Sequence, residues 1–273
     1  MRLVLKFQKH YAQFQKNELT AFQNEALQND SYLLNLFQTP AEEFIKTEKI
    51  QQIVCDYIAE VTYMCTFTSL ANLNAFQLMQ IAMYVNIPIH EFTLNLAKLT
   101  DPIRKNIILD TVISLDTKQH AIETKLGKKF TYSKLALALP LEEIQQLLPI
   151  RHDRIPATAY MFHITGQAKS QWSDADLELF QETESTIFIS KQSNGTYLFY
   201  SKIATPTFSD YFTEYKILAQ KYWNPAFFVG GHKLISMNQT ADIYLAGDIN
   251  IVGLEEAYIS GVSAANTIIQ ELN

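Results

Sequence analysis

The sequence is poor in cysteine and in positive charge, and each shortage excludes a class of protein. Its 273 residues contain two cysteines, Cys55 and Cys65, with no CxxC pair and no histidine pair nearby. A zinc site and a disulfide framework are therefore excluded, and we expect two buried, reduced thiols, as in a cytoplasmic protein. Lys and Arg number 22 against 28 Asp and Glu, which gives a net charge of −6. Because the chain has no basic excess to neutralise phosphates, we expect no nucleic-acid partner.

Long apolar runs and glycines are also scarce. No window of about 18 uninterrupted apolar residues exists, and the apolar run at the N-terminus is too short for a signal peptide, so no membrane-spanning helix is expected. Hydrophobic residues make up 48% and charged residues 18%, the balance of a folded soluble chain. No three of the eight glycines have the G-x-G-x-x-G spacing of a dinucleotide-binding turn.

The first third of the chain, residues 1–99, predicts helices. Apolar residues recur at helical spacing between Gln8 and Gln28, and Thr39-Pro40 has the form of a helix start. From Val61 to His90 there is no Lys, Arg, Asp or Glu. Two interpretations of this charge-free stretch stay open: packing helices with satisfied polar groups, or the lining of an apolar substrate pocket or a membrane-surface contact.

Strand signals begin near residue 100. Residues 106–116 and 120–125 predict two strands, the second ending in a charged turn at Gly127. Residues 135–139 (Leu-Ala-Leu-Ala-Leu) are apolar at every position, which predicts a strand of a parallel sheet, buried on both faces. Pro140 ends this run, and a short helix is expected over 142–147.

The segment from 157 to 203 alternates with a period of two residues, and Asn194-Gly195 is a strong hairpin signal. We therefore predict an antiparallel sheet, followed by a helix over 209–219. The charged cluster 151–154 (Arg-His-Asp-Arg) is interpreted as a solvated loop. The closing stretch combines an apolar strand over 243–246, a turn at Gly247 and one carboxylate, Asp248, before a helix that runs to the C-terminus. Such a strand–turn–helix forms either an anion or cofactor site or an ordinary βα unit.

Residues 243–268 resemble the C-terminal flavin-binding motif of the flavin-containing amine oxidase and phytoene desaturase superfamily. Members end in a strand, a Gly-Asp pair, a short loop, and a helix that passes through Ser-Gly to Ala-Ala. Residues 107–116 resemble the family strand in which a valine, here Val112, meets the adenine. Residues 132–140 resemble the segment that re-enters the flavin domain, and 223–227 resembles an aromatic Trp-x-x-Ala stretch.

The resemblance implies FAD as cofactor and gives roles to particular residues. Asp248 would hydrogen-bond a ribityl hydroxyl, the backbone from Leu254 to Ala257 would face the pyrimidine edge, and the helix dipole would stabilise the reduced flavin. Glu256 stands where the family usually has glycine. No catalytic base and no metal ligand is assigned. The implied cofactor contacts are Val112, Gly247, Asp248, Gly253, Leu254, Glu255, Glu256 and Ala257, and the implied substrate-pocket residues are Trp223 and Phe227.

The expected fold is a mixed α/β one: part of a doubly wound FAD/NAD(P)-binding domain plus a substrate domain of antiparallel sheet and helices. We expect a helical substrate part (1–99), a flavin segment (100–140), a substrate sheet with a helix (141–224) and a C-terminal flavin segment (225–273).

Function is interpreted on the same basis, as FAD-dependent hydride removal from a C–N or C–C bond of a small apolar or amine substrate. Another chain, a homo-oligomer or a longer version of this protein would supply the missing dinucleotide unit. Two alternatives stay open: a flavoenzyme-derived scaffold that only holds an apolar ligand or a partner chain, and a complete flavoprotein with an unusual cradle.

Overall fold

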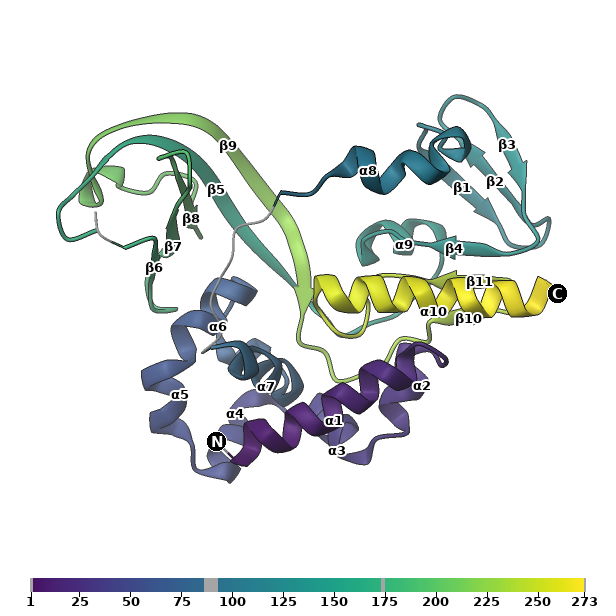
Figure 1. Cartoon of the computed structure of the whole chain (residues 1–273), viewed down its shortest axis with the longest axis horizontal. Helices are drawn as coiled ribbons and strands as arrows, with labels where there is room; N and C mark the ends of the chain where they lie inside the picture. Colours follow the sequence, from purple (N-terminus) through teal and green to yellow (C-terminus); the bar gives the residue numbers. More distant parts are fainter. Residues whose placement is uncertain (1, 86–92, 173–174, 273) are drawn as a thin grey trace.

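Helices form the N-terminal part of the computed structural model, which describes residues 2–85, 93–172 and 175–272 (Figure 1). They are α1 (Arg2–Glu18), α2 (Gln23–Gln28), α3 (Ser31–Gln38), α4 (Ala41–Glu48), α5 (Gln51–Tyr57), α6 (Ala59–Thr66), η1 (Leu70–Asn72) and α7 (Ala75–Tyr84). Side chains cap the N-termini of α3 and α7. Asp30 accepts the N–H groups of Tyr32 and Leu33, each at 3.0 Å, and Asn74 accepts that of Gln77 at 2.9 Å. The predicted helical region is confirmed.

The polar residues of the charge-free stretch are largely paired inside the protein. Asn74 donates to the carbonyl of Gly231 at 2.9 Å, and the Gln77 side chain accepts the N–H of Gly230 at 2.8 Å. Gln80 donates to the carbonyl of Val252 at 3.2 Å. These bonds join α7 to the C-terminal part of the chain, so the packing interpretation holds. Residues 86–90 of the stretch lie outside the described residues.

A small parallel pairing lies alongside the C-terminal helix, in the right-hand part of Figure 1. Strand β4 (Leu135–Leu137) pairs in parallel with β11 (Ile243–Leu245), which in turn pairs antiparallel with β10 (Asn238–Thr240). Helices α9 (Leu141–Leu147) and α10 (Leu254–Leu272) follow the two parallel strands. The parallel strand is confirmed, but its burial on both faces is wrong, because β4 is short and Ala136 is exposed.

A second layer precedes β4. It consists of α8 (Leu96–Thr100), η2 (Asp101–Asn106) and an antiparallel meander of β1 (Val112–Asp116), β2 (Ala121–Thr124) and β3 (Lys129–Thr131). The turn at Gly127, with φ of +76°, is confirmed. The strand predicted from residue 106 is wrong over 106–111, because a 3₁₀ helix occupies 101–106 and pairing starts only at Val112.

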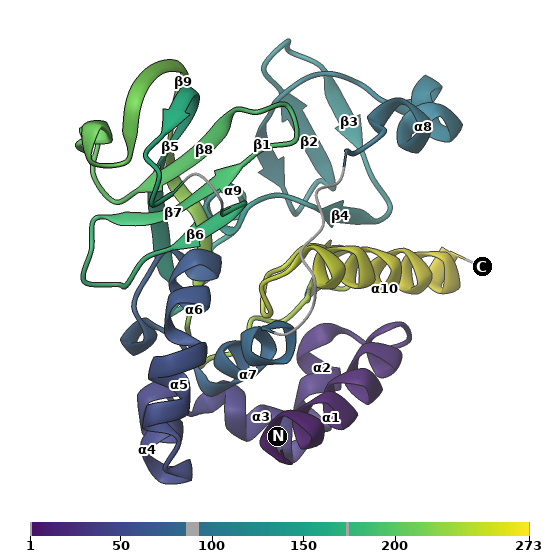
Figure 2. The ribbon, with the colours of Figure 1, turned by 60° about the vertical axis from the view of Figure 1, so that its left-hand side comes forward.

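The largest sheet is antiparallel, with the strand order β6-β7-β8-β5-β9 (Figure 2). Its members are β5 (Ile155–Ala168), β6 (Leu177–Leu179), β7 (Thr186–Lys191), β8 (Tyr197–Ser201) and β9 (Phe212–Val229), with η3 (Phe208–Asp210) before the last. The predicted sheet is confirmed, and so is its Asn194-Gly195 hairpin between β7 and β8, where Gly195 has φ of +80°.

The helix predicted over 209–219 is wrong, because most of this segment belongs to the long strand β9. Strand β9 pairs with β5 from Phe212 to Val229. The two backbones approach so closely at Gly166 that a Cβ there would lie 2.1 Å from the carbonyl oxygen of Glu214. The pairing partner, not the local pattern of residues 209–219, therefore decides the structure.

Three apolar cores hold these parts together. One joins α1–α7 to Ala157, Ala159 and Val229 of β5 and β9; another surrounds β4, β11 and α9; the third lies within the large antiparallel sheet. The chain thus has a mixed α/β fold of helices and largely antiparallel sheets. Among the described helices, none has the length and apolar character needed to cross a bilayer.

Candidate functional site

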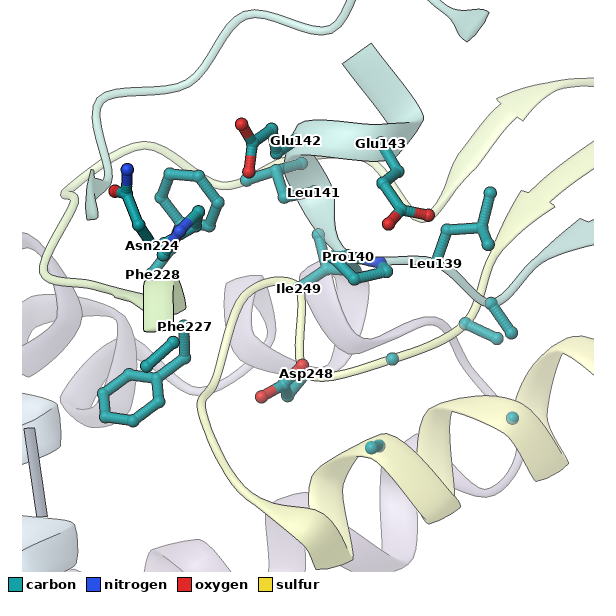
Figure 3. Close-up of a pocket in the computed structure, with 17 residues that line it drawn as sticks. Leu139, Pro140, Leu141, Glu142, Glu143, Asn224, Phe227, Phe228, Asp248 and Ile249 are labelled. Atoms are coloured by element: carbon teal, nitrogen blue, oxygen red, sulfur yellow. The ribbon is translucent and has the colours of Figure 1, made fainter. Parts of the chain in front are cut away.

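A cavity of about 620 Å³ lies where the carboxyl ends of β4 and β11 meet α10 and the end of β9 (Figure 3). Carboxyl ends of parallel strands are where open α/β sheets bind ligands. Asp248 projects from the loop between β11 and α10, with Phe227 and Phe228 on one side of it (Figure 3). The lining consists of residues 138–143, 224–228 and 246–249 together with Ala257 and Gly261.

Gly247 forms the turn that directs the chain from β11 into this cavity. Its φ of +146° is a conformation that side-chain-bearing residues rarely adopt. Ser260 of α10 fixes the turn, because its hydroxyl accepts the N–H of Gly247 and donates to the carbonyl of the same residue, both at 2.9 Å. The turn is therefore tied to the helix that forms one wall of the cavity.

Asp248 follows the turn and is exposed to the cavity. The backbone N–H groups of Asp248 itself and of Gly253 favour the ionised form of its carboxyl and so oppose a rise of its pKa. Burial by the surrounding protein raises the pKa of Asp248, and the positive charge of Arg154 partly opposes this shift. The Asp248 carboxylate thus lies under the influence of a buried cation, and Glu142 and Glu143 of α9 add two further carboxylates to the lining of the cavity.

Arg154 is that cation, and the prediction of a solvated loop over 151–154 is wrong for it. It is 5% exposed, and burial lowers the pKa of its guanidinium to about 10. One terminal nitrogen donates to the carbonyl of Asn250 at 2.6 Å, while Nε and Nη1 have no partner within the described residues. The neighbouring Asp153 accepts the N–H of His232 at 3.0 Å, which holds the loop in place.

The first turn of α10 turns its second glutamate away from the cavity. Glu256 is fully buried against α1, where the Tyr11 hydroxyl and, at 3.2 Å, the Gln15 amide donate to its carboxylate. Glu18 faces the same carboxylate, and burial together with this neighbour raises the pKa of Glu18 to about 9. Burial also raises the pKa of Glu256. A non-glycine residue fits at 256 because its side chain points into α1.

The structure brings together only some of the residues named from the sequence. Gly247, Asp248, Ala257 and Phe227 line the cavity. Trp223 lies on β9 beneath the Lys221 ammonium, 3.7 Å from the ring centroid, and does not line it. The others outside this lining are Val112 on β1, Gly253, Leu254, Glu255 and Glu256.

Sequence reasoning missed several residues of the site. In the sequence Ser260 is only one of several small residues suited to close packing, although its hydroxyl holds the Gly247 turn. Residues 138–143 follow an apolar strand, and the carboxyl end of a parallel strand is itself the signal that points to them. Arg154 gave no such signal, because only the fold shows that its loop is covered.

A second cavity, of about 450 Å³, lies between the helical part and β9. Its wall is largely apolar, so the charge-free stretch also lines a pocket, as the second interpretation proposed. Cys65 opens into it. Both thiols are free, but they are exposed rather than buried, and the protein around Cys65 raises its pKa to about 11. The lining residues are Val61, Met64, Cys65, Thr66, Gln77, Gln80, Ile81, Tyr84, Val229, Val252 and Gly253.

The fold is similar to that of several solved enzymes. A triple mutant of putrescine oxidase aligns at a TM-score of 0.64 and 11% identity, over 98% of this chain and 74% of the oxidase. Cyclohexylamine oxidase from Brevibacterium oxydans aligns at 0.56 and 9%, over 89% and 70%. Reduced UDP-galactopyranose mutase aligns at 0.54 and 10%, over 86% and 67%. The sequence itself matches no protein-family model and no curated protein. The chain therefore shares the fold of these enzymes.

Proposed function

We propose that this chain is the substrate-binding and flavin-contacting part of an FAD-dependent oxidoreductase of the amine oxidase type. The observation that carries the proposal is the cavity in which the Gly247-Asp248 turn and the first turns of α10 meet the carboxyl end of β4. The sequence resemblance of residues 243–268 supports it independently of this geometry. So does the fold, which is shared with two enzymes that are amine oxidases by name.

The residues around the cavity fit the ribityl and ring portion of FAD. Asp248 offers a carboxylate that is open to the cavity and accepts hydroxyl hydrogen bonds. Helix α10 begins at Leu254, so the N–H groups of its first turn have no acceptor within the helix and suit an electron-rich ring edge. No described segment has the glycine spacing of a pyrophosphate cradle. The proposal therefore includes a dinucleotide-binding unit that another polypeptide contributes.

Bound FAD would supply a hydride acceptor for oxidation of a C–N or C–C bond. The chain's own residues then have separate tasks. Asp248 holds the ribityl hydroxyls, and the positive end of α10 stabilises negative charge on the ring. Phe227 and Phe228 cover one side of the cavity and exclude water there. Arg154 places a buried positive charge near Asp248, which favours the ionised carboxylate.

The substrate would occupy the second, apolar cavity. The start of α10 lies between the two cavities, because Gly253 lines the apolar one and Ala257 lines the first. A small apolar or amine substrate in the second cavity would thus approach the ring across this turn. The polar groups in its wall are mainly the amides of Gln77 and Gln80, which already bond the backbone of Gly230 and Val252.

The test is co-expression with a polypeptide that carries a G-x-G-x-x-G strand–turn–helix, followed by a search for the visible absorbance of flavin in the purified complex. We expect stoichiometric flavin with the unaltered chain and a loss of at least about tenfold in flavin affinity for Asp248→Ala, because a hydrogen-bonded charged group is removed. Asp210→Asn, an exposed acid in η3, is the matched control and should keep the flavin. A folded complex without flavin would refute the proposal.

A second candidate, a non-catalytic protein that holds an apolar ligand, is favoured by the apolar cavity alone. Isothermal titration of the purified chain with dodecylamine and, separately, with FAD discriminates the two. Binding of dodecylamine that is lost in Ile81→Arg, without any affinity for FAD in the presence of a dinucleotide-binding partner, would favour the second candidate. Binding of both ligands favours the oxidoreductase.

A further inference from the structure

The layer formed by residues 93–131 has no core of its own. Between these positions the structure describes one short α-helix, a 3₁₀ helix and the three-stranded meander, and no apolar side chain in them is buried. Leu109 is 90% exposed, Leu126 70% and Ile113 57%. A small meander needs a covered apolar face to be stable in water. The layer therefore has the composition of an inner surface without the cover that such a surface requires.

Strand β4 presents an unpaired edge beside this layer. Leu135 donates to the carbonyl of Asp242 and Leu137 accepts from the N–H of Ala246, so both residues bond toward β11. Alternation along a strand then directs the peptide groups of Ala136 to the opposite edge. Within the described residues β4 ends its sheet on that side. The nearby Lys134 does not guard the edge, because its ammonium binds Asp242 at 3.0 Å and Glu271.

Helix α10 carries a second apolar face that points outward. Its inner face buries Ile259, Ser263 and Ala264 against the rest of the protein. On the outside, exposed apolar residues recur at intervals of four and seven, which places them along one stripe of the helix. They are Leu254 (77% exposed), Tyr258 (72%), Ala265 and Leu272 (60%). A helix that is apolar on both faces is normally buried on both.

The three surfaces belong to adjacent layers. In both views the meander lies on one side of β4 and α10 on the other (Figures 1 and 2). Within the described residues the middle layer consists of β4, β11 and β10, while the layers on either side of it expose apolar residues. Extending the middle layer from the free edge of β4 would bring new strands between the meander and α10.

We propose that these surfaces form the docking site for a βα unit, a strand followed by a helix, of a partner polypeptide. The partner's strand pairs with the Ala136 edge in the direction of β4, and its helix covers the stripe of Leu254, Tyr258 and Leu272. The meander covers the other face of the added strand. This docking site would receive the partner polypeptide of the proposed function, and its biological meaning rests on that proposal. The exposed surfaces themselves do not depend on flavin.

A second copy of this chain fits the site less well. A two-fold contact at β4 would pair the strand antiparallel with itself over three residues, and each copy would bring a further net charge of −6. A lipid surface satisfies the apolar stripe but offers no partner for the N–H and C=O of Ala136. A strand-and-helix unit satisfies both the edge and the stripe.

The experiment places a photo-crosslinking amino acid at position 258 of the full chain, expressed in the cells that naturally make it. The matched control carries the same amino acid at position 270, an exposed glutamine of α10 that does not belong to the stripe. A third variant combines Ala136→Pro with the photo-crosslinking amino acid at position 258. Proline removes the outward N–H that strand addition needs, and at an outward-facing edge position it costs no bond to β11. Cross-linked peptides are identified by mass spectrometry.

We expect position 258 to cross-link to a segment of another polypeptide that consists of an apolar strand, a turn and a helix. The yield should fall at least about tenfold with Ala136→Pro, and position 270 should give none. Cross-linking to a second copy of this chain, to lipid alone or to nothing would overturn the inference. If the partner docks but the complex holds no flavin, the proposed function fails and the docking site stands. If flavin is bound without cross-linking at position 258, the docking site fails and the proposed function stands.

Discussion

The helical region 2–84 and the layer 93–131 use similar apolar residues, which are buried in the first and exposed in the second. In the helical region Phe7, Leu27 and Phe76 are fully buried. In the layer Leu99, Leu109 and Ile113 are 63%, 90% and 57% exposed. Burial is therefore set by whether a neighbouring element exists to cover the residue, and not by the residue's own hydrophobicity. The helical region is covered by its own helices and by β5 and β9, whereas the apolar residues of the layer stay exposed within the described residues.

Helix α10 belongs to both regions. Its inner face packs on β11 and α1, and its outer stripe of Leu254, Tyr258 and Leu272 is exposed. The candidate flavin cavity lies at the amino end of this same helix. Completion of the open region by a partner and completion of the cofactor site are thus expected to occur together.

The largest contrast between the regions is expected on removing one apolar side chain from each. Phe76 packs edge-on against Phe7 and Tyr11, with ring centroids 5.3 and 5.9 Å away. Phe76→Ala should lower the free energy of unfolding by about 3–5 kcal/mol, because it leaves a cavity in a dense core. Leu109→Ala should change it by less than about 0.5 kcal/mol. Urea unfolding followed by circular dichroism measures both, and equal losses would contradict the division into a closed and an open region.

Two asparagine helix caps give a smaller and better matched contrast. Asn74 caps α7 and also donates to Gly231, all within the buried core. Asn95 caps α8 by accepting the N–H of Lys98 at 2.9 Å, and α8 buries no residue. We expect Asn74→Ala to lower the free energy of unfolding by about 2–3 kcal/mol and Asn95→Ala to lower it by at most about 0.5 kcal/mol. Because both asparagines make the same kind of cap, the difference between the two losses comes from the burial of Asn74 and its bond to Gly231. Thermal or urea unfolding of the two variants decides. A large loss for Asn95→Ala would show that the layer folds cooperatively with the core.

Local chemistry was enough to predict some parts of the molecule. An Asn-Gly pair between alternating runs specifies a hairpin, and an apolar strand followed by Gly247-Asp248 specifies a turn into a helix, because backbone preference and pattern agree there. That residues 135–139 form a strand of a parallel sheet followed from the uninterrupted apolar run, whereas the partner of this strand, β11, did not. In each case the information lies within about ten residues of the feature.

Other parts depend on contacts that are distant in sequence. Strand β9 carries a helix-like pattern, and β5 imposes its extended form by pairing along its whole length. Arg154 lies in a charged loop, and its burial is set by Asn250, 96 residues away. Glu256 accepts hydrogen bonds from Tyr11 and Gln15 of α1, and the residues next to Glu256 in the sequence do not indicate this contact. The same reasoning covers the docking site, because exposure of Leu109 and Tyr258 is visible only once the rest of the chain is placed.

The seam between the closed region and α10 gives the last prediction, which concerns pH. Glu18 keeps its proton in the folded state up to a pKa of about 9, against 4.5 for an unperturbed carboxyl, because it is buried beside Glu256. Between these values the unfolded chain binds fewer protons than the folded one, so stability falls as pH rises. The slope from one such group is at most about 1.4 kcal/mol per pH unit. Glu18→Gln, a neutral isostere of the protonated acid, should flatten this decline.

Urea unfolding at a series of pH values between the two pKa values measures the slope. Gln23 donates to Glu18 at 3.0 Å, and a glutamine oxygen at position 18 can accept the same bond while its amide donates toward Glu256. The variant should therefore match the unaltered chain at acidic pH and exceed its stability at alkaline pH. Glu123→Gln, on β2 of the open layer, is the control and should keep the original slope. If Glu18→Gln keeps that slope too, the carboxyl pair of Glu18 and Glu256 does not cause the loss of stability with rising pH.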